Sequence, residues 1–303
     1  MRVIGDSGDR KTASKTAGLC VSLISGLFMP RLTIAALLVA GVALLAADAP
    51  SQGGRRGGFY RNLNTPRDVA EGSYDGSFRF CRISFRNSPQ GDGDGWYVDY
   101  PRADENLSIR FGELTKAPVS HDAEGNPLHV VFPATDPELF KCGFVMMTEP
   151  GGSFFDEDEA KQLHTYLMKG GFLWADDFWG HYAFEWWSGQ IGKAMPPDRY
   201  PIFDVPLNHP IFHTQYNIKE IPQMPNIGLW MREHITSERG ADSAVPHFRG
   251  INDDKGRLVV VMTHNTDFGD GYERESESPD YFQRFSVPAY AIGVDVILYA
   301  MTH

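Results

Sequence analysis

Residues 170–187 contain an apolar run that ends abruptly in two adjacent carboxylates, Asp176 and Asp177. Four of the six tryptophans of the chain lie in the same segment, between positions 174 and 187. A short apolar run that brings acids and aromatics to one place is typical of the carboxyl end of a buried strand, where open α/β sheets hold their ligand groups. This segment therefore indicates an α/β fold and the place of a site.

Four further apolar runs have the length of strands, and amphipathic segments with a helical period lie between them. Predicted strands span residues 78–85, 129–132, 143–148, 172–175 and 257–262, and predicted helices span residues 104–114, 156–169 and 286–301. Strands that alternate with helices form right-handed βαβ units, which build a parallel sheet with helices on both faces. We therefore expect an α/β domain of three layers with a mainly parallel, flavodoxin-like sheet.

Two of the predicted helices have distinctive features. Asp156 is followed three residues later by Glu159, a spacing that predicts a capping box at the start of helix 156–169. Helix 286–301 has Asp295 as its only charge, so it should be buried in the domain. It is also too short to be a convincing membrane anchor.

Two other segments do not follow a regular period. Residues 196–246 hold eight prolines, and we expect an irregular excursion there with a short strand near residues 217–221. Residues 266–273 place acids at positions 267, 270 and 273, but the glycine and distal glutamate of a helix-loop-helix calcium site are out of place. We expect a turn in this second segment.

The first 49 residues have the plan of a secretory signal peptide. Arg31 precedes an uncharged run over residues 32–45, and residues 47–49 have the small-x-small form of a cleavage site. A spanning helix needs about 20 apolar residues, and this run is shorter, so we expect the segment to be cleaved. The alternative is an uncleaved anchor, and we expect membrane contact only in that case. Met29 could be the true start, because residues 29–49 form a complete signal by themselves.

The rest of the chain divides into a linker and one domain. Residues 50–72 are rich in glycine and arginine and read as a flexible linker, and residues 73–303 form a single α/β domain. Without residues 1–49 the chain has 23 basic and 36 acidic residues, a net charge of −13. Nucleic acid is not an expected partner, because its binding needs a basic patch. We expect export to the periplasm or cell envelope.

The cysteines give little evidence of their own. Cys20 lies before the expected cleavage point, and Cys81 and Cys142 lie in apolar, strand-like stretches. They could pair in an oxidising compartment, but we expect small buried thiols rather than a disulfide. No Cys-x-x-Cys pair occurs in the sequence, which excludes a thiolate zinc site of that kind.

Each predicted strand leads into polar residues at its carboxyl end. These ends meet at one edge of a parallel sheet, so groups far apart in the sequence should share one crevice. Three of these residues are candidates for catalysis, Asp176, Asp177 and His264, and six are candidates for ligand binding: Arg86, Asn87, Glu149, Trp179, Asn265 and Asp267.

Several kinds of chemistry fit this set of residues. His264 could act as a general base oriented by an acid, or it could bind a divalent metal together with the carboxylates. Alternatively, Asp176 and Asp177 cap the following helix and His264 bonds to nearby backbone. The aromatics after the strand could offer a stacking surface for a sugar, although core packing is the favoured explanation.

Four segments of the chain together resemble one bacterial family. Residues 94–107, 145–152, 170–180 and 262–270 are similar, in order, to motifs of a family known as domain of unknown function 4159. The resemblance runs from about residue 73 to residue 303. It implies a fold similar to class I glutamine amidotransferases and an envelope setting, but no activity. Where an amidotransferase has its nucleophilic cysteine after a strand, this chain offers Asp176 and Asp177.

Two functional hypotheses follow. The first is an envelope module without amidotransferase activity that binds a ligand or a protein partner at the strand ends. The second is a hydrolase acting on a saccharide or an envelope polymer through Asp176, Asp177 and His264, with or without a divalent metal.

Overall fold

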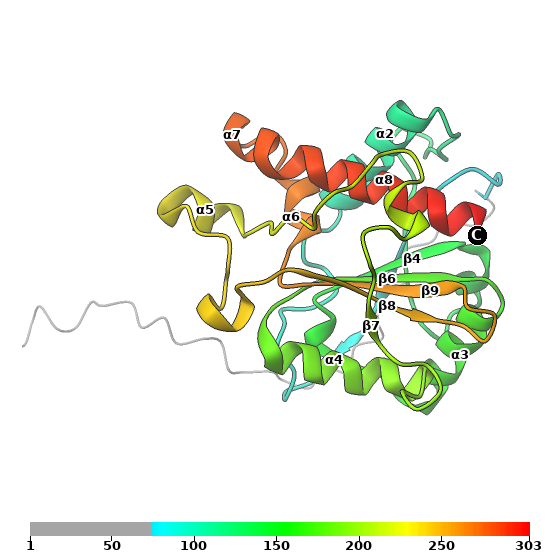
Figure 1. The fold of residues 1–303 in the computed structure, drawn as a ribbon. Coiled ribbons are helices and arrows are strands. Elements are labelled where there is room, and N and C mark those ends of the chain that lie inside the picture. The colour runs from blue at the N-terminus through cyan, green and yellow to red at the C-terminus, as the bar shows by residue number, and fades with distance from the viewer. Residues whose placement is uncertain (1–73) are drawn as a thin grey trace, which may run out of the picture. The chain divides into compact units, whose positions relative to one another are not determined.

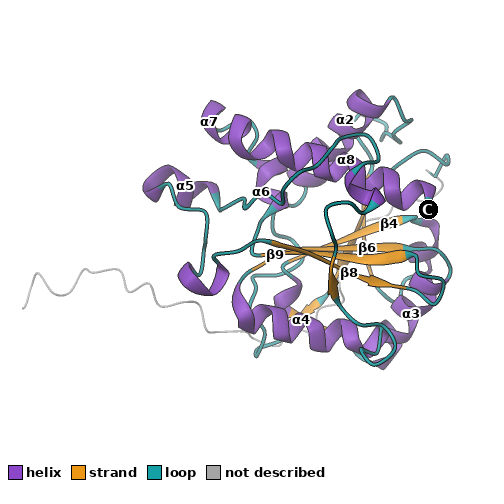
Figure 2. Ribbon diagram, viewed as in Figure 1, coloured by secondary structure: helices purple, strands orange, loops and turns teal. Residues whose placement is uncertain are grey.

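The computed structural model describes residues 74–303. The predicted signal peptide, the alternative start at Met29 and the linker at 50–72 lie outside these residues. The described part contains a seven-stranded sheet with helices on both of its faces, as Figures 1 and 2 show. The expected three-layer α/β fold is confirmed.

The elements follow one another along the chain in the alternation that the sequence predicts. The strands are β1 (Phe80–Ser84), β2 (Arg86–Asn87), β3 (His129–Pro133), β4 (Phe144–Thr148), β5 (Ser153–Phe154), β6 (Phe172–Phe178), β7 (Phe203–Asp204), β8 (His247–Asn252) and β9 (Leu258–His264). The helices are α2 (Arg102–Thr115), α3 (Glu157–Met168), α4 (Gly180–Ala194), α5 (Ile227–Glu233), α6 (Phe268–Glu273), α7 (Pro279–Tyr281) and α8 (Val287–Thr302). Asp156 and Glu159 form the expected capping box on α3.

The strand order of the large sheet is β3-β1-β4-β6-β9-β8-β7. The first five strands are parallel, and β8 and β7 add an antiparallel edge. Renumbered along the chain, the parallel strands run 2-1-3-4-5, which is the flavodoxin-like order. In such sheets the connections leave in opposite directions from the first and third strands, here β1 and β4. A crevice therefore opens between the loops that follow these two strands.

Side-chain alternation along the strands gives the sheet two separate cores. Phe80, Met146 and Trp174 face one side, where they pack in one cluster with residues of α2, α6 and α8. Leu173 and Met147 face the other side, with residues of α3 and α4. Figure 1 shows α2 and α8 on one side of the sheet and α3 and α4 on the other.

The C-terminal helix belongs to the first of these cores. The helical stretch Pro279–Thr302 is long and apolar enough to cross a membrane by length and composition alone, but 61% of its apolar window is buried within the domain. The buried residues of α8 include Val294, Val296 and Ile297, which belong to the core cluster of that face. The prediction of a buried core helix is confirmed.

The proline-rich excursion differs from its prediction. The short strand expected near residues 217–221 does not form, and the excursion instead contributes β7 and α5. The reason lies in Asp295, whose Oδ1 accepts the backbone N–H groups of Gln215 at 2.8 Å and Tyr216 at 2.9 Å. These bonds hold Gln215 and Tyr216 against α8, whereas Phe203 and Asp204 of the same excursion form β7 at the edge of the sheet.

The expectation of free cysteines is wrong for Cys81 and Cys142, which form a disulfide with a Cα–Cα distance of 6.3 Å. Cys81 lies in β1, and Cys142 lies two residues before β4. Because β1 and β4 are neighbours in the sheet, the fold brings two residues 61 positions apart to bonding distance. Local sequence could not show this, since the pairing depends on the order of the strands.

We expect the disulfide to contribute on the order of 4 kcal/mol to stability, because it closes a long loop in the unfolded chain. The double variant Cys81→Ala/Cys142→Ala should unfold at a lower urea concentration than the wild type. Reducing agent should lower the wild-type midpoint to a similar value and leave the variant unchanged. Equal midpoints for the oxidised wild type and the variant would contradict a stabilising bond.

Candidate functional site

Segments that follow β1, β4, β6 and β9, together with Asn226, Glu238 and Arg239 of the proline-rich excursion, enclose a pocket of about 480 Å³. It lies beside the crevice that the strand order creates, where ligands bind in open α/β sheets. Eight carboxylates line it: Asp94, Asp99, Glu149, Asp177, Glu238, Asp267, Asp270 and Glu273. We call this cavity the acidic pocket.

Little positive charge balances these carboxylates. Of the side chains lining the pocket, only Arg239 and Arg274 are cationic. Arg274 pairs with two of the pocket acids, Asp270 and Glu273, and also with Glu277. Arg239 pairs with Asp92. The remaining pocket acids therefore form a concentrated negative field, which would attract a cation.

Three pocket acids have a backbone conformation that favours glycine. Asp99, Glu149 and Asp177 have φ angles of 61°, 51° and 60°. Such conformations cost roughly 1–3 kcal/mol each and persist where the surroundings enforce them, often at functional sites. At Asp177 the strand also departs from regular pairing, because the β6–β9 register shifts between Asp176 and Phe178. These sharp turns direct the three carboxylates into the pocket. In a regular strand the same side chains would point in other directions.

Arg82 positions the first loop of the acidic pocket. Its guanidinium is fully buried and forms a bidentate pair with Asp104. The same group donates to the carbonyl oxygens of Trp96 at 2.9 Å and Val98 at 3.1 Å. It also donates to Thr148 Oγ1 on β4 at 2.7 Å. One side chain of β1 thus ties together α2, β4 and the loop that precedes α2.

The loop is also held from its other side. The Glu149 carboxylate accepts the backbone N–H groups of Gly95, at 2.9 Å, and Asp94. Asn87 supports the same loop, because its Nδ2 donates to the Asp94 carbonyl at 2.8 Å. The sequence-predicted residues Asn87 and Glu149 therefore shape the pocket.

Burial and mutual repulsion raise the pKa values of the pocket carboxyls. Burial raises the pKa of Asp177 well above its ordinary range, and repulsion by Glu149 and Asp99 adds to this. The pKa of Asp267 rises for the same reasons. Burial raises the pKa of Glu149 to about 7 and that of Asp270 to about 6. The acidic pocket therefore holds more protons near neutral pH than exposed carboxylates would.

Asp176 lies beneath the acidic pocket rather than in it. Its side chain is fully buried and accepts hydrogen bonds from the Thr263 hydroxyl and from the Gly269 N–H at 3.0 Å. Burial raises its pKa to about 7. The contact to Gly269 fixes the start of α6, so Asp176 has a supporting position.

His264 lies on the other side of β9, in a separate pocket of about 650 Å³ with His247, Arg249 and Asn265. Arg249 donates to its Nδ1 at 2.9 Å, so Nε2 carries the proton and donates to the Gly180 carbonyl at 2.9 Å. Burial lowers the pKa of His264 to about 4. Its ring is neutral at pH 7, and both of its nitrogens are already bonded.

The three catalytic candidates therefore do not line one pocket. Asp177 lies in the acidic pocket, Asp176 is buried below it and His264 faces α4. Asn265 stays with His264, where its Oδ1 accepts the Gly180 N–H at 2.8 Å.

Arg86 is directed away from the acidic pocket. It pairs with Asp156, at 2.7 Å, and with Glu159 at the start of α3.

Most of the tryptophan-rich segment packs in the core, as expected. Trp174 and Trp187 are fully buried, and the one tryptophan that lines the acidic pocket is Trp179. Its Nε1 donates to Asp177 Oδ1 at 2.8 Å, which orients the carboxylate. Tyr182 is 55% exposed but lies outside the pocket lining.

Five acids of the pocket were not among the candidates from the sequence: Asp94, Asp99, Glu238, Asp270 and Glu273. Asp99 follows β1 only after a loop, although it lies in the segment 94–107 that carries the family resemblance. Asp270 lies where a turn was expected, but residues 268–273 form α6 with Asp267 as its N-cap. Asp99, Asp267 and Asp270 each place a carboxylate oxygen within 4.8 Å of the others.

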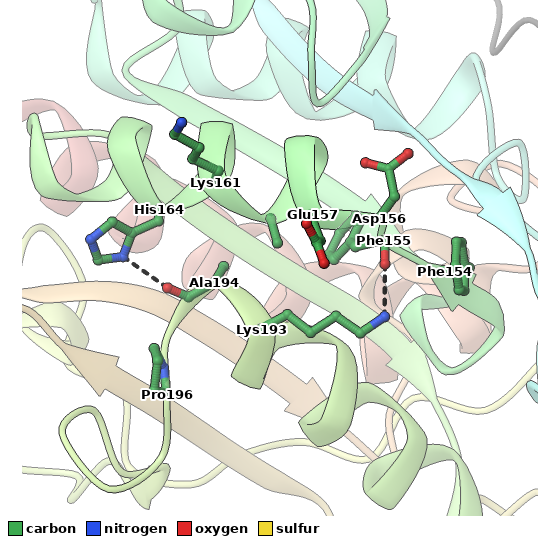
Figure 3. A pocket seen from close by; sticks show the side chains of 10 residues that line it. Phe154, Phe155, Asp156, Glu157, Lys161, His164, Lys193, Ala194 and Pro196 are labelled. Carbon is green, nitrogen blue, oxygen red and sulfur yellow. Dashed lines mark hydrogen bonds between the residues drawn. The ribbon is translucent and has the colours of Figure 1, made fainter.

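A larger hollow of about 840 Å³ lies between α3 and α4 and shares no lining residue with the acidic pocket. Figure 3 shows Lys193 and His164 reaching backbone carbonyls across it, those of Phe155 at 2.7 Å and Ala194 at 2.8 Å. His164 and Lys193 thus hold α3, α4 and the segment before α3 together. We place the candidate site in the acidic pocket.

The fold and the site define an α/β domain of flavodoxin-like strand order with an acidic pocket at its switch point. The chain belongs to the family described as domain of unknown function, DUF4159, whose model matches residues 79–301. Comparison with curated proteins finds no match to the chain.

We expect Arg82→Met to lower the free energy of unfolding by roughly 3–5 kcal/mol, because it leaves Asp104 buried without a partner. The double variant Arg82→Met/Asp104→Leu should recover much of this loss, since neither buried charge remains. Urea unfolding of both variants and of Asp104→Leu closes the cycle. A double variant as unstable as the sum of the single ones would contradict direct coupling.

Stability should fall as the pH rises from 5 to 7. In this range the pocket carboxyls keep protons in the folded state that they lose when unfolded, because their folded pKa values are raised. Glu149→Gln should reduce the fall by about 2 kcal/mol. Urea unfolding at several pH values measures it, with Glu185→Gln on exposed α4 surface as the control. Parallel pH profiles for the wild type and Glu149→Gln would show that Glu149 is not responsible.

Proposed function

We propose that this protein is a binding module of the cell envelope that takes a positively charged ligand into the acidic pocket. The observation that carries the proposal is the acidic pocket, in which eight carboxylates and two arginines meet beside the carboxyl ends of the parallel strands. Binding sites in open α/β sheets lie at this position. A bound cation would supply the positive charge that the two arginines do not provide for the eight carboxylates.

The burial of the carboxylates supports this ligand chemistry. Asp177 is 6% exposed and Asp267 is 4% exposed, so water screens their repulsion poorly. A buried carboxylate needs a partner charge, a donor or a proton. A bound cation would replace the protons that the raised pKa values retain, and the repulsion between the acids would become attraction for the ligand.

The absence of a free thiol among residues 74–303 argues against amidotransferase chemistry in this domain. Both cysteines of residues 74–303 form the disulfide, so this part of the chain has no thiol for nucleophilic attack. At the end of β6 the chain has Asp177, whose carboxylate accepts a hydrogen bond from Trp179.

The envelope setting has support from two independent features. The first 49 residues have the pattern of a secretory signal, and disulfides form in oxidising compartments such as the periplasm. An envelope protein or a saccharide is the partner class that this setting favours. An amino sugar would suit the pocket, because it combines an ammonium group with hydroxyls.

The hydrolase hypothesis has less support. His264 faces away from Asp177, and both of its ring nitrogens are engaged with Arg249 and Gly180. General base catalysis needs a nitrogen within reach of the proton that it takes.

Organic cations should raise the melting temperature of the protein, and spermidine and glucosamine are suitable probes. EDTA in all samples excludes metal effects. Glu149→Gln and Asp177→Asn should each weaken the apparent affinity at least tenfold, about 1.4 kcal/mol, because each removes a carboxyl group that can lose its proton to pair with the bound cation. Thermal shift titrations measure the affinities.

The exposed variant Glu185→Gln is the matched control for net charge and should bind within about twofold of the wild type. If neither probe shifts the wild-type melting temperature, or if Glu185→Gln loses the response equally, the proposed pocket is wrong.

A further inference from the structure

Three carboxylates converge on one side of the acidic pocket. Asp99, Asp267 and Asp270 are all buried, and each offers an oxygen within 4.8 Å of the other two. Oxygens that ligate calcium at 2.3–2.6 Å are at most about 5 Å apart across the ion. A single ion could thus contact all three side chains with little movement of any of them.

Asp99 adds an independent indication of a ligand. It is 8% exposed, and among the described residues its Oδ2 is buried with no hydrogen-bond partner. A buried acceptor without a donor costs roughly 1–3 kcal/mol, and more when it is charged. The positive charge of Arg82 offsets part of this cost, but no described group donates a hydrogen bond to Oδ2.

The unpartnered oxygen faces the other two acids. A Cβ added at Gly269 would overlap the Asp99 carboxylate, and the same position is 3.3 Å from Asp267 Oδ1. Asp99 Oδ2 and Asp267 therefore meet over the Gly269 backbone, at the start of α6. The missing side chain of Gly269 makes the space in which they approach.

The other two carboxylates are fixed by the backbone. Asp267 Oδ1 accepts the Asp270 N–H at 2.7 Å, and Asp270 Oδ2 accepts the Ile227 N–H at 2.8 Å. Asp99 is held by its loop, whose carbonyls bind Arg82. The three acids are thus preorganised on two separate segments, and no rearrangement is needed to bring them together.

From these observations we infer that Asp99, Asp267 and Asp270 form a binding site for a hard divalent cation, with calcium as the favoured ion. This inference rests on the proposed cation-binding function and specifies the cation. The set contains carboxylate oxygens without histidine or thiolate, which favours calcium, magnesium or manganese over zinc. Calcium accepts irregular sites rich in carboxylates, whereas magnesium keeps several waters and requires a near-octahedral arrangement. The open side of the pocket leaves room for further ligands on the ion.

The test uses the purified protein as processed in cells, freed of metal with EDTA and then dialysed. Calorimetric titration with CaCl2 should show one site per chain, and calcium should raise the melting temperature. Asp99→Asn should weaken calcium binding at least tenfold and remove this rise. Without calcium, the variant should melt at or above the wild-type temperature, because it removes a buried, unpartnered charge. This last result separates lost coordination from lost folding.

A second variant tests the geometry without removing a carboxylate. Gly269→Ala should displace Asp99 and weaken calcium binding at least tenfold, whereas Gly189→Ala, at a position with open space around it, should bind as the wild type does. Glu185→Gln should also bind within about twofold of the wild type. Calcium binding that survives both Asp99→Asn and Gly269→Ala would overturn the assignment, and so would tighter binding of zinc or magnesium.

The two proposals separate in the same experiments. One outcome is that calcium, magnesium and manganese all fail to bind at millimolar concentration, while spermidine still stabilises the wild type but not Glu149→Gln. In that case the metal site is wrong and the proposed pocket for organic cations stands. If neither the metals nor the organic cations bind, both are wrong.

Discussion

The acidic pocket depends on the contacts that the buried guanidinium of Arg82 makes with three neighbouring segments. Burying a charge is costly, and here the cost is offset by a bidentate carboxylate, two carbonyls and a hydroxyl. The planar fork of an arginine can serve all of these acceptors at once, and a lysine ammonium cannot. These acceptors lie on different elements. Arg82 therefore defines where α2, β4 and the loop that precedes α2 lie relative to β1.

The Arg82–Asp104 pair also explains why the positive charge of Arg82 does not neutralise the carboxyl groups of the acidic pocket. Arg82 lowers the pKa of Asp99 to some extent, but burial and the neighbouring acids outweigh it. Its charge is matched by Asp104 and its donors are directed at the loop backbone. Arg82, whose donors all have acceptors, thus holds the loop that carries Asp99. Asp104 neutralises Arg82, so the Asp99 carboxylate keeps an oxygen without a donor.

Much of the fold could be predicted from the sequence, because apolar runs mark the parallel strands and helical periods mark α2 and α3. The strand-end argument also found Glu149, Asp177 and Asp267, which follow or end their strands. It failed for His264 because successive side chains of a strand face opposite sides: Thr263 bonds to Asp176, while His264 stacks near Phe184 on α4. It missed Asp99 because a loop, held by long-range bonds to Arg82, brings this residue to the strand ends. No local pattern records such bonds, and the Cys81–Cys142 pair was hidden for the same reason.

The disulfide and the acidic pocket lie at opposite ends of the same two strands. Cys81 and Cys142 join β1 and β4 near their amino-terminal ends, whereas the pocket opens where these strands finish. At the pocket end the strands are held by non-covalent contacts, including the bond from Arg82 to Thr148. The covalent restraint therefore lies at the end of these strands that is away from the acidic pocket. The two strands are thus joined by a covalent bond at one end and, at the end that carries the acidic pocket, by hydrogen bonds and other non-covalent contacts alone.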